Sequence, residues 1–87
     1  MVDSPRTLKR DRTSARHQRL RELLVQARLA RELTQVQVAA MLGKPQSFVS
    51  KYEHGDRNLD VIDLLTVCVV LECDALSILS ELRSMGE

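Results

Sequence analysis

The chain has 87 residues, which is enough for one domain with one modest hydrophobic core. Hydrophobic residues make up 44% of the sequence and aromatic residues only 2%, so the core must be aliphatic, and three glycines and two prolines argue against a sheet of many short strands. The net charge of +1 conceals an asymmetry, because residues 1–31 carry nine Lys and Arg against three Asp and Glu, whereas residues 32–87 carry four against nine.

Residues 1–13 are polar and basic, contain Pro5 and show no apolar periodicity, so we expect a flexible N-terminal arm. Such an arm could follow a nucleic-acid backbone, and a merely solvated tail is the alternative. Beyond it, either Thr13 or Ser14 could cap a first helix. This amphipathic helix of about four turns is predicted from apolar residues at helical spacing, namely Leu20, Leu23, Leu24, Ala27 and Ala30.

Two short helices are predicted next. Thr34 is the expected N-cap of the first, over residues 35–42, and Gly43 ends it where a left-handed residue is commonly needed. Pro45 suits the first turn of a helix over residues 45–53, because it fixes φ and lacks an amide that would stay unpaired.

A fourth and a fifth helix are predicted after Asp60 and Asp74, which are plausible N-caps. Five helices with short connections and no internal repeat indicate an all-α fold, a compact five-helix bundle that occupies residues 14–87.

Cys68 and Cys73 lie five residues apart in an apolar helical run, with no second cysteine pair or nearby His to complete a zinc site. We expect reduced thiols that fill the core, with a disulfide or a metal as the alternative. Neither a metal nor another cofactor is expected. No apolar run approaches the roughly 18 residues of a membrane span, and the N-terminus lacks the apolar core of a secretory signal, so a cytoplasmic protein is expected.

The two helices at 35–42 and 45–53, separated by a glycine-containing turn, have the pattern of a helix-turn-helix. In this motif the second helix enters the major groove of DNA and the first lies across the backbone. Ala39 would allow the two helices to cross closely. With Val49 and Tyr52 pointing inward, the outer face of the second helix would carry Gln46, Ser47, Ser50 and Lys51.

The runs Leu33–Ala39, Leu42–Gly43 and Pro45–Gly55 resemble the phage-repressor-like, or XRE/Cro-type, helix-turn-helix family. The resemblance covers about residues 18–82 and implies a lambda-repressor-like DNA-binding domain. Lys44 departs from it by replacing an aliphatic residue. Glu72 replaces the usual glycine after the fourth helix, so it would be mildly strained if it adopts a positive φ.

The resemblance places Gln46, Ser47 and Lys51 at base-reading positions, with Ser50 on the same face. Glutamine suits the N6/N7 edge of adenine, serine can pair with several bases, and lysine suits guanine O6/N7 or a nearby phosphate.

Contacts to the DNA backbone are expected from residues around the reading helix. The resemblance implies that Gln35 binds a phosphate oxygen, and the alternative is that it only joins the capping arrangement of Thr34. Lys44, Arg57 and Asn58 are further backbone candidates from the two loops that flank the reading helix.

Glu53 is an acidic residue on the helix that is predicted to contact DNA. The resemblance implies that it forms an ion pair with Arg28 of the first helix, which would clamp the reading helix in position. Phe48 could touch a thymine methyl, or it could pack sideways against the loop before the fourth helix.

The sequence thus predicts a sequence-specific transcriptional regulator that binds double-stranded DNA. An enzyme is not expected, because the chain lacks a Ser/His/Asp order, paired carboxylates and a phosphate-binding glycine loop. A homodimer is expected because one such module buries limited surface. Its interface could use Val69, Val70, Ile78 and Leu82, unless these all belong to the core. The rival hypothesis is a protein-interaction module of the same fold, an antitoxin or adaptor whose main partner is another protein.

Overall fold

A computed structural model describes residues 14–86, so the predicted arm at residues 1–13 lies outside the described residues. Within the described part, the chain forms five α-helices joined by short connections. They are α1 (Ala15–Ala30), α2 (Gln35–Leu42), α3 (Gln46–His54), α4 (Val61–Leu71) and α5 (Ala75–Ser84). The predicted all-α fold with five helices is confirmed.

Side-chain caps fix where four of these helices begin. The side chains of Ser14, Thr34, Asp60 and Asp74 accept hydrogen bonds from backbone amides in the first turns of α1, α2, α4 and α5. Such amides have no partner inside the helix, so each cap stabilises one particular start. Of the two candidates before α1, Ser14 is the cap.

The start of α3 differs from the prediction by one residue. Pro45 has φ −69° and ψ 155°, so it is the extended N-cap and not the first helical residue, and α3 continues to His54. Proline fixes only φ, and a φ of this value suits both a helix and an extended residue. The carbonyl of Pro45 still accepts the first bond of the helix, from the amide of Phe48 at 2.9 Å.

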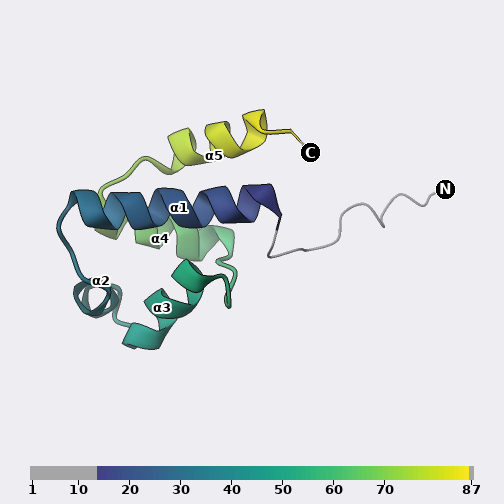
Figure 1. Ribbon diagram of the computed structural model, residues 1–87. Helices are drawn as coiled ribbons and strands as arrows, with labels where there is room; N and C mark the ends of the chain where they lie inside the picture. The colour runs from purple at the N-terminus through teal and green to yellow at the C-terminus, as the bar shows by residue number, and fades with distance from the viewer. Residues whose placement is uncertain (1–13, 87) are drawn as a thin grey trace.

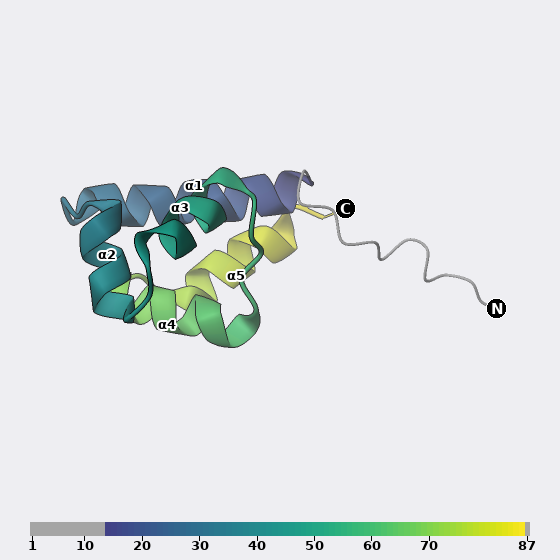
Figure 2. The same ribbon diagram turned by 90° about the horizontal axis from the view of Figure 1, so that it is seen from below.

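The longest helix, α1, lies between α5 on one side and the pair α2 and α3 on the other (Figure 1). Seen from below, α3 lies in front, with α2 at one end and α1 and α4 at its sides (Figure 2). All five helices contribute to one core, whose buried residues are Leu24, Val38, Ala39, Phe48, Val49, Tyr52, Leu64, Val67, Cys68, Leu71 and Ile78. This packing holds α3 on the outside of the bundle with one face free.

The apolar residues of α4 and α5 divide between this core and the surface. Of the four residues considered for a dimer interface, Ile78 is buried, and Val70 and Leu82 pack against the core, so only Val69 is exposed. Both alternatives are therefore wrong, because the four residues neither form one surface patch nor all belong to the core. Other large apolar side chains of the two helices are exposed instead, namely Val61, Ile62, Leu65, Leu76 and Leu79.

Glu72 follows α4 in the left-handed conformation, with φ 55° and ψ 42°, at the position where the family usually has glycine. A side chain in this region crowds its own backbone, so the conformation is strained as expected. Arg31 lies beside it and donates from Nη1 to the carbonyl of Val70 at 2.6 Å, while Nη2 is 3.5 Å from a Glu72 carboxylate oxygen. Arg31 thus ties the end of α1 to the end of α4.

Both cysteines are free thiols. Cys68 is buried in the core and Cys73 is half-buried against it. Burial, followed by a hydrogen bond with Cys73, raises the pKa of Cys68 to about 12, so its thiol stays protonated at neutral pH. The side chains therefore pack as small hydrophobic groups, as expected.

Candidate nucleic-acid interface

The turn between α2 and α3 sets the angle between the two helices. Gly43 ends α2 with φ 69°, in the left-handed region that glycine adopts without strain, and its amide bonds back to the carbonyl of Ala40. Ala39 is 2% exposed in the core to which α2 and α3 both contribute. Val38 and Val49 of the same core are completely buried. Because Ala39 is buried in this shared core, a larger side chain there would disturb the packing of the two helices.

The two faces of α3 differ sharply in polarity. Phe48, Val49 and Tyr52 are buried in the core. Gln46, Ser47 and Lys51 are exposed on the opposite side, and Ser50 is half-buried near them. The face predicted to read bases is therefore the open face of α3.

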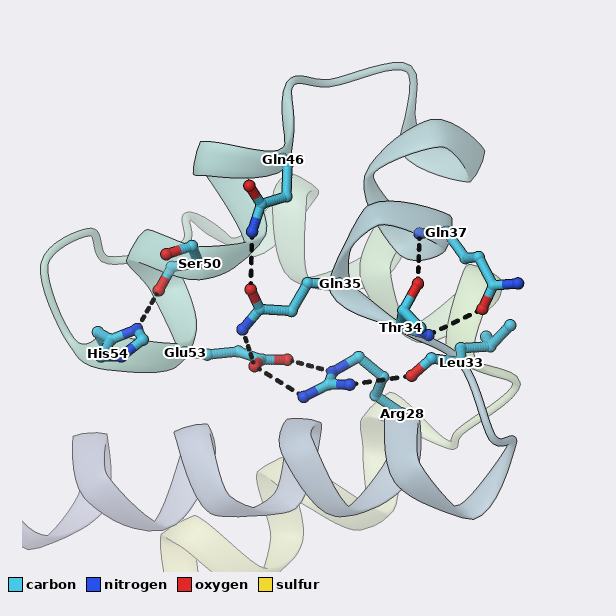
Figure 3. A network of polar contacts seen from close by, with 9 residues as sticks. All are labelled: Arg28, Leu33, Thr34, Gln35, Gln37, Gln46, Ser50, Glu53 and His54. Atoms are coloured by element: carbon cyan, nitrogen blue, oxygen red, sulfur yellow. Dashed lines mark hydrogen bonds and ion pairs between the residues drawn. The ribbon is translucent and has the colours of Figure 1, made fainter.

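Glu53 is held against α1 by the ion pair predicted with Arg28. Nε of Arg28 donates to Oε2 of Glu53 at 2.7 Å, and Nη2 donates to Oε1 at 3.1 Å, so the pair is bidentate (Figure 3). Nη1 of the same arginine donates to the carbonyl of Leu33 at 2.9 Å. The Glu53 side chain is only 6% exposed, so this carboxylate points away from the open face of α3.

Hydrogen bonds of two glutamines connect the ion pair to the open face of α3. Nε2 of Gln35 donates to Oε1 of Glu53 at 2.8 Å, and Nε2 of Gln46 donates to Oε1 of Gln35 at 2.9 Å (Figure 3). A carboxylate only accepts hydrogen bonds, so Gln35 must turn its amide nitrogen to Glu53 and its oxygen to Gln46. The orientation of the Gln46 amide is therefore determined by a chain of contacts that starts at Arg28.

The capping arrangement at the start of α2 involves Gln37 and not Gln35. Oγ1 of Thr34 accepts from the Gln37 amide at 3.1 Å, while Oε1 of Gln37 accepts from the Thr34 amide at 2.8 Å. This reciprocal pair is a capping box. The alternative that Gln35 only joins the cap of Thr34 is wrong, and the side chain of Gln35 serves the chain of contacts to Gln46.

The loops on both sides of α3 present positive charge. Lys44 and Arg57 are exposed, and both lie over the ring of Phe48, with Nζ of Lys44 5.3 Å and Cζ of Arg57 4.8 Å from the ring centroid. Phe48 also meets Tyr52 edge to face at 5.8 Å. Of the two alternatives for Phe48, sideways packing toward the loop before α4 is the one observed. Asn58 is half-buried and lines a small cavity between this loop and α1.

The arginines of α1 differ from the cations around α3 in their partners. Arg19, Arg28 and Arg31 each form an ion pair with a glutamate. Among the residues that the structure describes, no carboxylate lies within ion-pair distance of Lys44, Lys51 or Arg57. Within residues 14–86, the cations that form no ion pair with a carboxylate thus include one residue on α3 and one in each loop beside it.

Sequence reasoning found the residues of the open face and the Arg28–Glu53 pair, but it missed three contacts. These are the Gln35–Gln46 hydrogen bond, the role of Gln37 in the cap, and the position of two cations over the Phe48 ring. Only the capping box had a local signal, Thr34 followed three residues later by Gln37. Between residues 14 and 86, no cluster of side chains could hold a metal ion, and none of the helices is long and apolar enough to cross a membrane.

Comparisons with known proteins place this geometry in a family. Residues 24–77 match a family described as helix-turn-helix. An XRE-family like protein from Pseudomonas syringae pv. tomato str. DC3000 is 46% identical, over 84% of this chain and 89% of that chain, with a TM-score of 0.77. No curated protein sequence matches the chain.

Two restriction-modification controller proteins are similar in structure. C.AhdI from Aeromonas hydrophila is 25% identical, over 69% of this chain and 91% of that chain, with a TM-score of 0.63. Another, solved as a tetramer in complex with its natural 35 base-pair operator, is 21% identical, over 82% of this chain and 93% of that chain, with a TM-score of 0.70, a likeness that concerns the fold alone. On the family match and the 46% identical relative, the chain belongs to the XRE family of helix-turn-helix proteins, which are DNA-binding transcriptional regulators and not enzymes.

Proposed function

We propose that the protein regulates transcription by reading a specific sequence in the major groove of duplex DNA with α3. The observation that carries this proposal is the hydrogen-bonded chain from Arg28 through Glu53 and Gln35 to Gln46. It removes the negative charge of Glu53 from the open face and orients an amide at the amino-terminal end of α3. That end is the part of a reading helix that approaches base edges.

Gln46 is suited to adenine because its amide keeps one hydrogen-bond donor and one acceptor for a base. One N–H of Nε2 is donated to Gln35, so the second N–H and the oxygen Oε1 remain for DNA. Adenine presents an N7 acceptor and an N6 donor in the major groove, and this pair matches the remaining donor and acceptor of the amide. Ser47, Ser50 and Lys51 would complete the reading face, with Lys51 directed to guanine or to a phosphate.

Gln35, Lys44, Arg57 and Asn58 are proposed to contact the DNA backbone around the reading helix. The first turn of α2 offers unpaired amides beside Gln35, and the helix dipole favours an anion there. Lys44 and Arg57 contribute charge from the two loops. Such contacts set affinity and register, whereas base contacts set sequence preference. Residues 1–13 could extend this footprint, since they are rich in Lys and Arg.

The protein is proposed to act as a homodimer on two half-sites. Ile62, Leu65 and Val69 of α4 lie three and four residues apart and are all exposed, so they form an apolar stripe on the helix. Exposed apolar stripes of this kind often mark protein–protein contacts. A two-fold dimer through this stripe would offer two reading helices for half-sites about 34 Å apart.

The experiment is a selection of bound duplexes from a random DNA pool with the full chain, followed by titration of the selected duplex at several salt concentrations. An enriched inverted repeat, with affinity that falls steeply as salt rises, is the expected result. An enriched single half-site would contradict the dimer alone. No duplex binding at low salt would overturn the proposed function and favour a protein-interaction module.

A further inference from the structure

Lys44 and Arg57 are separated by thirteen positions in the sequence, but the same aromatic ring holds them both. Lys44 precedes α3 and Arg57 follows it, while Phe48 lies on the helix between them. Nζ of Lys44 is 5.3 Å and Cζ of Arg57 is 4.8 Å from the centroid of the Phe48 ring. Both distances are within the roughly 6 Å at which the negative face of a ring attracts a cation.

The ring is fixed in the core, whereas the two cations are at the surface. Phe48 is 8% exposed and meets the ring of Tyr52 edge to face at an interplanar angle of 79°. Lys44 and Arg57 are exposed, and the described residues place no carboxylate within ion-pair distance of either. Phe48 therefore supplies a rigid reference point for two flexible side chains that form no ion pair within residues 14–86.

Stacking on a ring leaves the hydrogen-bonding groups of a cation available. A guanidinium that contacts a ring through its face keeps its N–H groups in the plane, and an ammonium keeps the N–H groups that point away from the ring. Both can then bind a phosphate oxygen without leaving the ring. Because long side chains lose conformational entropy when a partner immobilises them, a side chain already held in place binds its partner more tightly.

We propose that Phe48 is a positioning residue that holds Lys44 and Arg57 together as a two-point clamp for DNA phosphates beside the reading helix. This inference rests on the proposed DNA-binding function and deepens it. The alternative is that Phe48 only fills the core and that the two cations lie over its ring without consequence for binding. The two accounts differ in whether the electrostatics of the ring, and not only its volume, affect DNA affinity.

The test replaces Phe48 by pentafluorophenylalanine in the full chain. This residue closely keeps the shape of the ring and reverses the sign of the electrostatic potential at its face. We expect a loss of affinity for the selected duplex of about tenfold, because two side chains are no longer pre-ordered, with unchanged base preference. Lys44→Gln and Arg57→Gln should each reduce the magnitude of the negative slope of log affinity against log salt by about 0.9 in the parent chain. Each of these two substitutions should lower DNA affinity by a smaller factor in the fluorinated chain than in the parent chain. Arg83→Gln, which removes an exposed cation from α5, is the control and should leave affinity and slope unchanged.

A second measurement uses the unmodified protein. Protons on the side chains of Lys44 and Arg57 should show upfield NMR shifts from the Phe48 ring, both free and bound to DNA. Shifts that disappear in the complex would overturn the clamp, because the cations would then have left the ring. Full affinity in a fluorinated chain of unchanged thermal stability would also overturn it. Failure of the parent chain to bind any duplex would instead contradict the proposed function.

Discussion

Glu53 places a carboxylate on the helix that is proposed to face DNA, where a free negative charge would repel phosphates. The structure accommodates this residue by turning it toward α1, where Arg28 and Gln35 occupy both of its oxygens. The gain in stability from such a pair is expected to be modest, because both groups lose hydration when they are buried. The contribution of the pair is then to fix the orientation of α3 and of the Gln46 amide.

Arg28→Met tests whether the Arg28–Glu53 ion pair has the energetics of a buried pair. The substitution leaves the Glu53 carboxylate, which is 6% exposed, without its cation, so the free energy of unfolding should fall by about 3 kcal/mol in urea denaturation. Arg28→Met combined with Glu53→Leu should lose less than the two single changes added together. Arg19→Met, which breaks a more exposed pair with Glu81, is the control and should behave as a surface substitution. Equal losses for Arg28→Met and Arg19→Met would contradict this assignment.

The site was partly predictable at the level of residues. Sequence pattern identified the outer face of α3 because Val49 and Tyr52, three residues apart, define its inner face. The Arg28–Glu53 pair followed from the family resemblance. The hydrogen bond between Gln35 and Gln46 could not be foreseen, because it depends on which way each amide turns. That choice is made by a carboxylate 18 residues from Gln35, and spacing carries no information about it.

At the scale of helices, local chemistry determined most boundaries. The caps at Thr34, Asp60 and Asp74 depend on side chains that bond to amides two or three residues away, so they are readable from sequence. Positive φ at Glu32, which follows α1, had no such signal, because neither the residue nor its neighbours favour that conformation. Glu72 was identified only because the family has glycine there.

Glu72→Gly should stabilise the protein. Glycine has no Cβ atom and adopts the left-handed conformation of this position without a clash. The free energy of unfolding should therefore rise by about 1 kcal/mol. The contact with Arg31 that is lost is long, at 3.5 Å, and contributes little. Gln26→Gly on an exposed position inside α1 is the matched control and should destabilise by about 1 kcal/mol. Destabilisation by both variants would mean that the strain at Glu72 is absent in solution.

At the scale of the whole molecule, the class of fold was predictable, but the exposed side of α4 was not. Apolar residues cover most of the circumference of this helix, so periodicity could not show which of them face the core. Three of the four residues considered for a dimer interface lie in or against the core, and the exposed stripe of Ile62, Leu65 and Val69 became visible only when α1, α2 and α5 were in place around α4.

Val69→Glu tests whether this stripe joins two copies of the protein. Val69 is 76% exposed, so a charge there should leave the fold intact but prevent apolar surfaces from pairing. We expect sedimentation to show a shift from dimer to monomer, and affinity for a duplex with two half-sites should fall. Leu29→Glu, at a 58% exposed position on α1, is the control and should change neither property. A parent chain that sediments as a monomer even on DNA would contradict the dimer.

Base reading by α3 is proposed to depend on the Gln46 amide, whose orientation is set by the chain of contacts from Arg28. The most direct test compares base preference at every position of the selected duplex for the parent chain, Gln46→Ala and the exposed α1 variant Gln26→Ala. Loss of a bidentate contact is worth about 1–3 kcal/mol, so Gln46→Ala should lose a preference of roughly 5- to 150-fold for adenine at one position of each half-site. Preferences at the other positions, and those of Gln26→Ala, should stay unchanged. A Gln46→Ala protein that keeps the parent's preference at every position would contradict base reading by Gln46.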